Sequence, residues 1–210
     1  MTMNRIDMDR STETVQKTIP QKLFLELDEN LTINRIDMDR FSETVQRAKD
    51  DLSKTKKIIE FEGNWEIGEI GPQFSAKINT ENGGEFLIQS DEPMALGGSG
   101  SAPNPVQYGL YGIAACYSAA FVKWISNEGI IINKFKVKVK ADMDIAASLG
   151  IFKEPPIPFY EHIKFEIIID SELSMKEIER FNEITKQRCA CYYCLTTAII
   201  PEIVLKKEDK

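Results

Sequence analysis

Four cysteines are the residues of this chain best suited to chemistry, because a thiolate can act as a nucleophile, a redox centre or a metal ligand. Three of them lie together near the C-terminus in the run Cys189-Ala-Cys191-Tyr-Tyr-Cys194, and the fourth is Cys116. By residue type alone, Cys116 reads as a small buried hydrophobe, since Ala, Gly and Tyr surround it. The C-terminal cluster carries too large an oxidation risk to be mere packing. It therefore indicates either a metal site or thiol–disulfide chemistry.

A zinc site is the first of these alternatives. On a single helix, which turns 100° per residue, Cys191 and Cys194 would point about 200° and 140° away from Cys189, so one face cannot present all three. His162 is the single histidine and would have to be the fourth ligand, while paired Cys-x2-Cys knuckles are missing from the sequence. We therefore expect no metal, and we expect His162 to be an ordinary polar residue near the start of a strand.

A thiol peroxidase is the second alternative. A thiolate cleaves the O–O bond of a peroxide, becomes a sulfenic acid and is captured by a resolving cysteine as a disulfide. The two cysteines must approach to Cα separations of about 4.4 to 6.8 Å. Cys116 and one member of the cluster can meet this condition if their two helices pack side by side.

The helices that would carry these cysteines have clear sequence signals. Asn104 is a candidate N-cap with Pro105 at the first helical position, and a helix of about twenty residues should follow, ending at Asn127 and Gly129. The run from Ser174 to Glu177 is typical of a capping box and predicts a helix towards Arg188.

Strands are predicted in the sequence both before and after the first of these helices. Apolar runs from Lys57 to Ile88, broken by Gly63, Gly71-Pro72 and Asn82-Gly83-Gly84, indicate an antiparallel meander. The segment 131–141 alternates apolar residues with lysines and predicts a half-exposed strand whose lysines are solubilising. After a proline-rich connector at 142–158, residues 162–170 predict another strand, and the tail 201–205 predicts a last one.

A partial repeat marks the N-terminus. Residues 2–10 recur as 32–40 and residues 13–16 recur as 43–46, after which the match ends. A solenoid needs about three stacked copies, so the repeat is interpreted as a local duplication or a cloning remnant. We predict that residues 1–30 form a peripheral extension and that residues 31–210 form the domain. Each copy should contain a short strand followed by a helix, the better-formed helix spanning 42–49.

Composition sets the broad class. The 210 residues carry a net charge of −7, which argues against binding to nucleic acid or to an acidic membrane surface. The longest apolar stretch, 108–125, is interrupted by Lys123 and fits a buried helix better than a membrane span. No apolar signal-peptide core is present at the start, so we expect a cytoplasmic protein whose cysteines are reduced at rest.

A longer pattern resembles a known family. The run from Asp91 to Tyr108, which reads DEPMALGGSGSAPNPVQY, is followed by Ala114-Ala-Cys116-Tyr and by a cysteine near the end of the next helix. Together with the lead-in from Thr32, this is similar to the superfamily of osmotically induced protein C and organic hydroperoxide resistance protein (OsmC/Ohr). The resemblance implies an α+β fold with antiparallel sheets wrapped around two central helices. It also implies an intertwined homodimer with active sites at the subunit interface.

The resemblance further implies roles for particular residues. Cys116 corresponds to the peroxidatic cysteine, Cys189 best matches the family's resolving cysteine, and Cys191 is the alternative resolving residue. The implied function is a cysteine-dependent reduction of organic hydroperoxides, recycled by a dithiol reductant and without a cofactor. Apolar and amide side chains near Cys116 are candidates for the substrate pocket, although the aromatic ones are equally typical of a dimer core. These pocket candidates are Gln107, Tyr108, Tyr111, Tyr117 and Phe121.

Two departures from the family pattern favour an alternative. Active family members hold the thiolate with an arginine and with a glutamate that follows the helix-start proline. Here Val106 and Gln107 follow Pro105, and no arginine occurs between Arg47 and Arg180. The alternative is a non-enzymatic or weakly active member that senses redox state or binds a small molecule.

Overall fold

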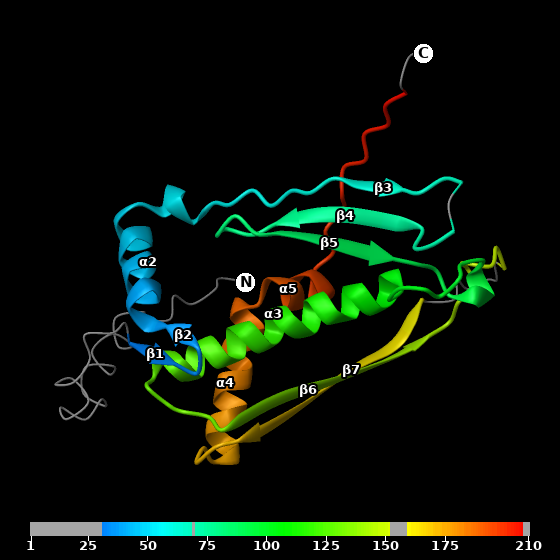
Figure 1. The fold of residues 1–210 in the computed structure, drawn as a ribbon. Helices are drawn as coiled ribbons and strands as arrows, with labels where there is room; N and C mark the ends of the chain where they lie inside the picture. Colours follow the sequence, from blue (N-terminus) through cyan, green and yellow to red (C-terminus); the bar gives the residue numbers. More distant parts are fainter. Residues whose placement is uncertain (1–30, 69, 152–158, 208–210) are drawn as a thin grey trace.

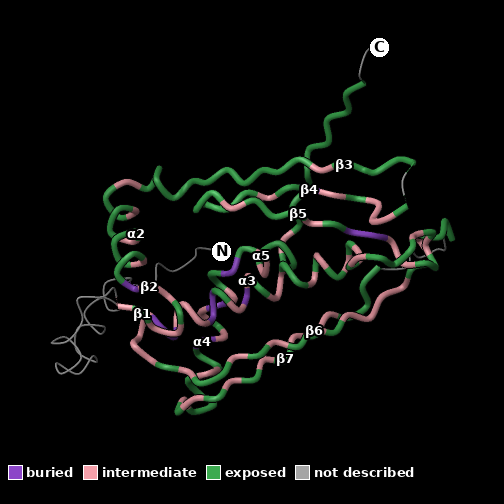
Figure 2. The backbone as a smooth tube through the Cα atoms, viewed as in Figure 1, coloured by how far each residue is buried: buried purple, intermediate pink, exposed green. Residues whose placement is uncertain are grey.

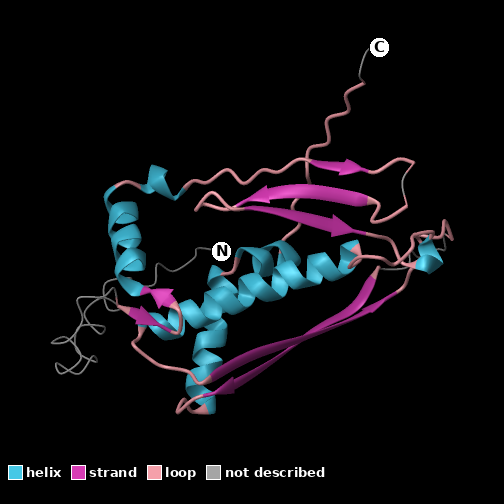
Figure 3. Cartoon of the chain, viewed as in Figure 1, coloured by secondary structure: helices cyan, strands magenta, loops and turns pink. Residues whose placement is uncertain are grey.

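A long central helix lies between two antiparallel sheets in the computed structural model, which describes residues 31–68, 70–151 and 159–207 (Figure 1). The β3–β4–β5 sheet lies on one side of helix α3 and the β6–β7 pair lies on the other (Figure 3). The helices are α2 (Met38–Asp50), α3 (Pro105–Asn127), α4 (Met175–Arg188) and α5 (Ala190–Thr196). The strands are β1 (Thr32–Ile33), β2 (Ile36–Asp37), β3 (Gly63–Trp65), β4 (Phe74–Asn79), β5 (Glu85–Ser90), β6 (Lys134–Met143) and β7 (Tyr160–Asp170). Short 3-10 turns occupy Leu52–Thr55 and Met94–Leu96.

Helix α3 begins and ends where the sequence predicts. The side chain of Asn104 accepts a hydrogen bond from the backbone N–H of Gln107, and the side chain of Gln107 accepts one from the backbone N–H of Asn104. This reciprocal pair satisfies two of the free N–H groups at the helix start. After the helix ends, Gly129 adopts a φ of 73°, which a side-chain-bearing residue rarely takes.

The meander predicted between Lys57 and Ile88 is confirmed as the β3–β4–β5 sheet. Strand β4 pairs antiparallel with both neighbours, and Asn79 faces Glu85 across the turn at Asn82-Gly83-Gly84. Gly83 takes a φ of 83° in this turn, which explains why glycine stands there.

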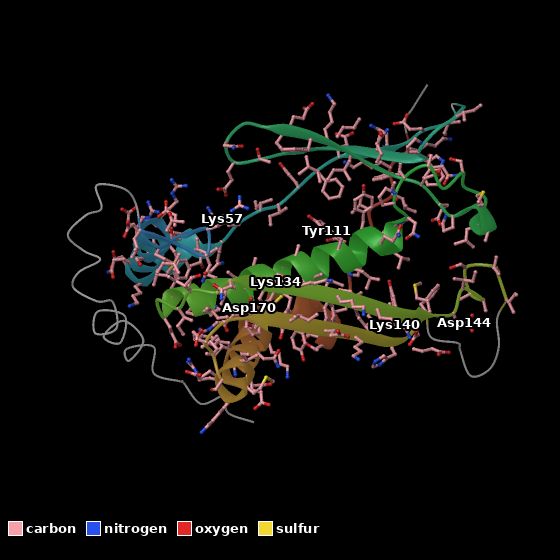
Figure 4. All side chains as sticks on the ribbon, turned by 60° about the horizontal axis from the view of Figure 1, so that its bottom comes forward. Lys57, Tyr111, Lys134, Lys140, Asp144 and Asp170 are labelled. Carbon is pink, nitrogen blue, oxygen red and sulfur yellow. The ribbon has the colours of Figure 1, made fainter. Side chains whose placement is uncertain are left out.

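The second sheet is a long hairpin of β6 and β7, joined through residues that are only partly described. Phe135, Val137 and Val139 are half-buried, whereas the alternating lysines of β6 are exposed, as the alternation predicts. Figure 4 shows Lys134 and Lys140 along this strand and Asp170 on its partner, where Asp170 pairs in register with Lys134. Glu166 likewise faces Lys138. Acidic residues of β7 thus face two of the lysines across the strand pair, and all four lysines are exposed, in keeping with a solubilising role.

Helices α4 and α5 are separated at a single residue, Cys189. The predicted capping box of Ser174 and Glu177 opens α4. The backbone N–H of Cys189 closes α4 by donating to the carbonyl of Thr185, and the Cys189 sulfur accepts from the N–H of Tyr192 at the start of α5. The expectation that residues 189–194 lie on one helix is wrong, because Cys189 has an extended backbone and lies between two helices.

The N-terminal part of the described chain differs in detail from the prediction. The expected single strand is a small hairpin, β1 and β2, turned by Asn34 and Arg35 with φ values of 50° and 66°. Asp37 then caps α2, so the helix begins four residues before the predicted one. The first copy of the repeat lies outside the described residues.

The prediction of a strand at residues 201–205 is also wrong. Residues 199–207 form neither helix nor strand, and Ile200, Ile203 and Leu205 are exposed. In Figure 1 the segment leaves α5, crosses the β3–β5 sheet in this view and extends beyond it, and it pairs with none of the described strands.

The core is centred on α3 and α4 (Figure 2). Phe121 and Phe181 are fully buried, and Phe121 packs on Phe135 of β6 with ring centroids 5.4 Å apart. Cys189 belongs to the same cluster at 2% exposure. Among the described helices none is both long and apolar enough to span a bilayer.

Candidate active site: a cysteine cluster between helices α3 and α5

Cys116 and Cys189 meet where α3 passes the junction of α4 and α5. The Sγ of Cys189 donates to the Sγ of Cys116 across 3.5 Å, and the two residues lie 73 positions apart in the sequence. A disulfide has an S–S length of about 2.05 Å, so the sulfurs need to approach by roughly 1.5 Å. Both cysteines are free thiols in this structure.

Further groups from α5 surround the sulfur of Cys116. It accepts a hydrogen bond from the Cys189 thiol, and the backbone N–H groups of Ala190 and Cys191, together with the Cys191 side chain, act to lower its pKa. Partial burial raises the pKa of Cys116, but these donors outweigh burial and hold the pKa below its ordinary value. A larger fraction of Cys116 is therefore thiolate at neutral pH than for an ordinary cysteine.

The neighbouring thiols shift in the opposite direction. Burial, followed by the hydrogen bond and the charge of Cys116, leaves the pKa of Cys189 above its ordinary value. Burial and the same neighbour raise the pKa of Cys191 to about 11. Cys116 is consequently the member of the buried group that ionises first, and the other two act as its donors.

The two arginines of α4 contact other side chains. Arg180 forms a bidentate pair with Glu128, with both N···O distances at 2.6 Å. The guanidinium of Arg188 stacks 3.7 Å from the ring centroid of Trp124. The backbone N–H groups of Ala190 and Cys191 are among the groups that lower the pKa of Cys116.

The five predicted pocket residues lie in different surroundings in the structure. Phe121 is fully buried and Tyr117 is 6% exposed, so both belong to the core. Tyr117 donates to Asn182 of α4, and burial raises its pKa to about 12. Gln107 is held in the cap of α3, and Tyr111 is 71% exposed on the side of α3 that faces the β3–β5 sheet (Figure 4).

Tyr108 lines a cavity. This cavity, of about 500 Å³, lies between the β3–β5 sheet and the first turn of α3. Its walls are Phe61, Trp65, Phe74, Ala76, Ile78, Ile88, Ser90, Pro105 and Tyr108. Tyr108 precedes Cys116 by eight residues, or about 12 Å along the helix axis. The Ser90 hydroxyl is buried there without a hydrogen-bond partner.

Asp91 organises the loop before α3, which sequence reasoning did not foresee. It is 1% exposed, and its Oδ2 accepts from the backbone N–H and hydroxyl groups of Ser99 and Ser101. These hydrogen bonds, that of the Ser99 hydroxyl first, lower the pKa of Asp91 to about 2. The signal was present as an acidic residue followed by a run of alternating glycine and serine. The interaction fixes the loop that leads into the cap of α3.

His162 does not join the cysteines. It lies on β7 opposite Asp142 of β6 and is exposed. Among residues 31–68, 70–151 and 159–207, no three His, Cys, Asp or Glu side chains are arranged to hold a metal ion. The zinc reading therefore has no ligand set in this part of the chain.

The sequence of the chain matches the profile of a known protein family. The family profile described as OsmC-like protein matches residues 98–204, which include Cys116, Cys189, Cys191 and Cys194. The chain belongs to the OsmC-like family. The match begins later than the resemblance from Thr32 that the sequence suggested.

Several solved structures are similar to this OsmC-like protein. An OsmC-like protein from Mycoplasma pneumoniae is 19% identical, with 67% of this chain and 89% of that chain covered at a TM-score of 0.50. A putative osmotic stress induced and detoxification response protein from Psychrobacter arcticus is 18% identical, covering 65% and 88%, at a TM-score of 0.48. An organic hydroperoxide resistance protein OsmC from Legionella pneumophila is 17% identical, covering 67% and 91%, at 0.43. No curated protein sequence matches the chain. The helices and antiparallel sheets of the chain, and its likeness to the Mycoplasma pneumoniae protein, confirm the predicted α+β fold.

Proposed function

We propose that this protein is a cysteine-dependent peroxidase that reduces organic hydroperoxides. The single observation that carries the proposal is the 3.5 Å approach of the Cys116 and Cys189 sulfurs, with Cys116 the thiol of lowered pKa. A thiolate beside a second thiol is the arrangement that peroxide reduction by disulfide formation requires.

The proposed cycle begins with attack by the Cys116 thiolate on one peroxide oxygen. An S–O bond forms, the O–O bond breaks, and the departing alkoxide takes a proton to leave as an alcohol. Cys189 then loses its proton and attacks the sulfur of the sulfenic acid. The S–S bond forms and the oxygen leaves with two protons as water. An external dithiol reopens the disulfide and is itself oxidised.

An apolar substrate is favoured over a charged one. The cavity beside Tyr108 is walled mainly by aromatic and aliphatic side chains. An organic hydroperoxide combines an apolar tail with one polar end and so matches such a lining.

A homodimer is part of the proposal. Apolar side chains are exposed on the β3–β5 sheet, on α3 and on the C-terminal segment, for example Phe86, Tyr111 and Ile200. Surfaces of this kind are usually covered by a partner. Sedimentation velocity should give twice the 23.9 kDa chain mass; a monomer at micromolar concentration would refute the dimer. We place the protein in the cytoplasm, where its free thiols would stay reduced.

The function is tested by peroxide consumption. With dithiothreitol as reductant, the protein should consume tert-butyl hydroperoxide faster than it consumes hydrogen peroxide, and Cys116→Ser should consume neither above the reductant blank. Equal rates for wild type and Cys116→Ser would refute the proposal.

A second candidate, a redox sensor, is favoured by the occupied arginines. Because Arg180 and Arg188 hold Glu128 and Trp124, no guanidinium of α4 assists the leaving oxygen. A sensor would form the Cys116–Cys189 disulfide stoichiometrically yet show little turnover with excess reductant. The ratio of the first oxidation rate to the steady-state rate separates the two functions.

A further inference from the structure

The four cysteines form a graded series from the core to the surface. Cys189 is 2% exposed, Cys116 and Cys191 are partly buried, and Cys194 is exposed. A disulfide between Cys116 and Cys189 would therefore include a sulfur that an external reductant hardly reaches. An exchange reaction requires a direct approach of the attacking thiolate to one sulfur of the disulfide, so burial slows reduction.

Cys191 is the link between the buried pair and the surface. It is the second residue of α5, two positions after Cys189, whose sulfur lies 3.5 Å from that of Cys116. It packs against the same core cluster as Cys116, yet it lies on the helix that also carries the exposed Cys194. Cys191 is thus placed to attack the Cys116 sulfur once that sulfur is part of a disulfide.

Cys191 and Cys194 have the spacing of a redox pair. They are three positions apart on α5 in the run Cys191-Tyr-Tyr-Cys194, so their side chains differ by about 60° around the helix. Ideal helix geometry puts their Cα atoms about 5 Å apart, inside the range of disulfides. Their Cβ atoms must approach further, and this is feasible because α5 ends at Thr196, within one turn of Cys194.

The pKa of Cys191 depends in part on whether Cys116 carries a charge. In the reduced protein burial raises the pKa of Cys191, and the hydrogen bond and charge of Cys116 raise it further, so Cys191 stays a thiol. When Cys116 enters a disulfide, its charge no longer raises the pKa of Cys191. A larger fraction of Cys191 is then thiolate, the form that attacks a disulfide.

We propose that Cys191 and Cys194 form an exit pair that takes over the disulfide from Cys116 and Cys189 and presents it to an external dithiol reductant. The proposal rests on the peroxidase function proposed above. It assigns chemistry to Cys194, which the peroxidase cycle leaves without a role.

The transfer is balanced in atoms and electrons. Cys191 loses a proton and attacks the Cys116 sulfur, which forms a Cys191–Cys116 disulfide and releases Cys189, which takes up a proton. Cys194 then loses a proton and attacks the Cys191 sulfur, and Cys116 leaves as a thiolate. Two thiols are oxidised while one disulfide is reduced, so no further oxidant is needed. The Cys191–Cys194 disulfide is finally reduced at the surface by the external dithiol.

Disulfide mapping tests the exit pair. The purified full-length protein is oxidised with one equivalent of tert-butyl hydroperoxide, quenched by alkylation at timed intervals and digested for mass spectrometry. We expect a Cys116-linked disulfide first and a Cys191–Cys194 disulfide later. In Cys194→Ser the oxidation should stop at disulfides that contain Cys116. Tyr193→Phe, at an exposed position of the same helix, should behave as wild type.

Turnover gives a second readout. With thioredoxin as a bulky dithiol reductant, Cys194→Ser should lose about tenfold or more in steady-state rate, because only the surface disulfide is accessible to a protein. The exit pair is overturned if no Cys191–Cys194 disulfide forms in wild type and Cys194→Ser turns over at the wild-type rate.

Oxidation by diamide separates this test from that of the peroxidase function, since diamide makes disulfides without any peroxide chemistry. If peroxide fails to oxidise Cys116 but one equivalent of diamide yields the Cys191–Cys194 disulfide through a Cys116-linked intermediate, the exit pair stands while the peroxidase function fails. If diamide yields only Cys116–Cys189, the exit pair fails on its own.

Discussion

The sulfur of Cys189 lies 3.5 Å from the sulfur of Cys116, although one residue caps α5 and the other lies in the middle of α3. The relationship depends on the short break between α4 and α5, which turns the Cys189 side chain towards α3. The same break points the first N–H groups of α5 at the Cys116 sulfur. In the proposed cycle, this one local feature would supply both the donors to Cys116 and the resolving thiol.

Two single substitutions should separate the roles of the pair. Cys116→Ser should abolish peroxide consumption because the attacking thiolate is gone. Cys189→Ser should still consume a first equivalent of peroxide and accumulate a sulfenic acid or a glutathione adduct on Cys116, visible by intact mass. If Cys191→Ser and not Cys189→Ser has this effect, Cys191 is the resolving residue. Full activity of Cys116→Ser would end the peroxidase reading.

The reactivity of Cys116 should depend on pH with a midpoint below that of an ordinary thiol. Since the pKa of Cys116 is lowered, its thiolate is lost only as pH falls through that lowered value, and its alkylation rate should fall there. Iodoacetamide labelling of the Cys116 peptide, quantified by mass spectrometry from pH 5 to 10, measures the midpoint. The protein unfolded in urea is the control; the same midpoint in both states would show that α5 does not activate Cys116.

Phe121 should be a stability residue and not a substrate contact. Phe121→Ala should lower the free energy of unfolding by about 3 to 5 kcal/mol, because it empties a fully buried site against Phe135 and Phe181. Lys136→Ala, on the exposed side of β6, should change it by less than about 0.5 kcal/mol. Urea denaturation measures both, and similar small effects would mean that the core is not centred on Phe121.

Asp91 should make the stability of the protein depend on acid. Its folded pKa of about 2 lies below its ordinary value of 3.8, so its contribution is present above that ordinary value and is lost as pH falls through about 2. Asp91→Asn should lower the melting temperature at pH 7 by about 4 °C or more and should flatten the loss between pH 4 and 2. An unchanged acid profile in Asp91→Asn would show that the serine loop does not depend on this carboxylate.

Local signals in the sequence were enough to predict most elements. The Asn104-Pro105 start of α3, the Ser174 and Glu177 capping box of α4 and the alternation along β6 each use only neighbouring residues. Such patterns fix an element whatever packs against it. The meander from Lys57 to Ile88 was equally local, because glycine-containing turns separate its strands.

Features that depend on tertiary contacts were not predictable in the same way. The break at Cys189 follows from packing against α3, and nothing in the Arg188-Cys189-Ala190 sequence demands it. The C-terminal segment has a strand-like composition but no neighbouring edge within the chain. Tyr117 and Phe121 fitted a pocket by type, yet the contacts of Tyr117 with Asn182 and of Phe121 with Phe181 place both in the core.

The proposal that Cys116 attacks the peroxide and then forms a disulfide with Cys189 is best tested by mass spectrometry of the protein after one equivalent of organic hydroperoxide. At the earliest times we expect a disulfide between the Cys116 and Cys189 peptides. It should form at the rate of peroxide loss and be absent from Cys116→Ser. Peroxide loss without any disulfide or oxygen adduct on Cys116, or a first disulfide that lacks Cys116, would contradict it.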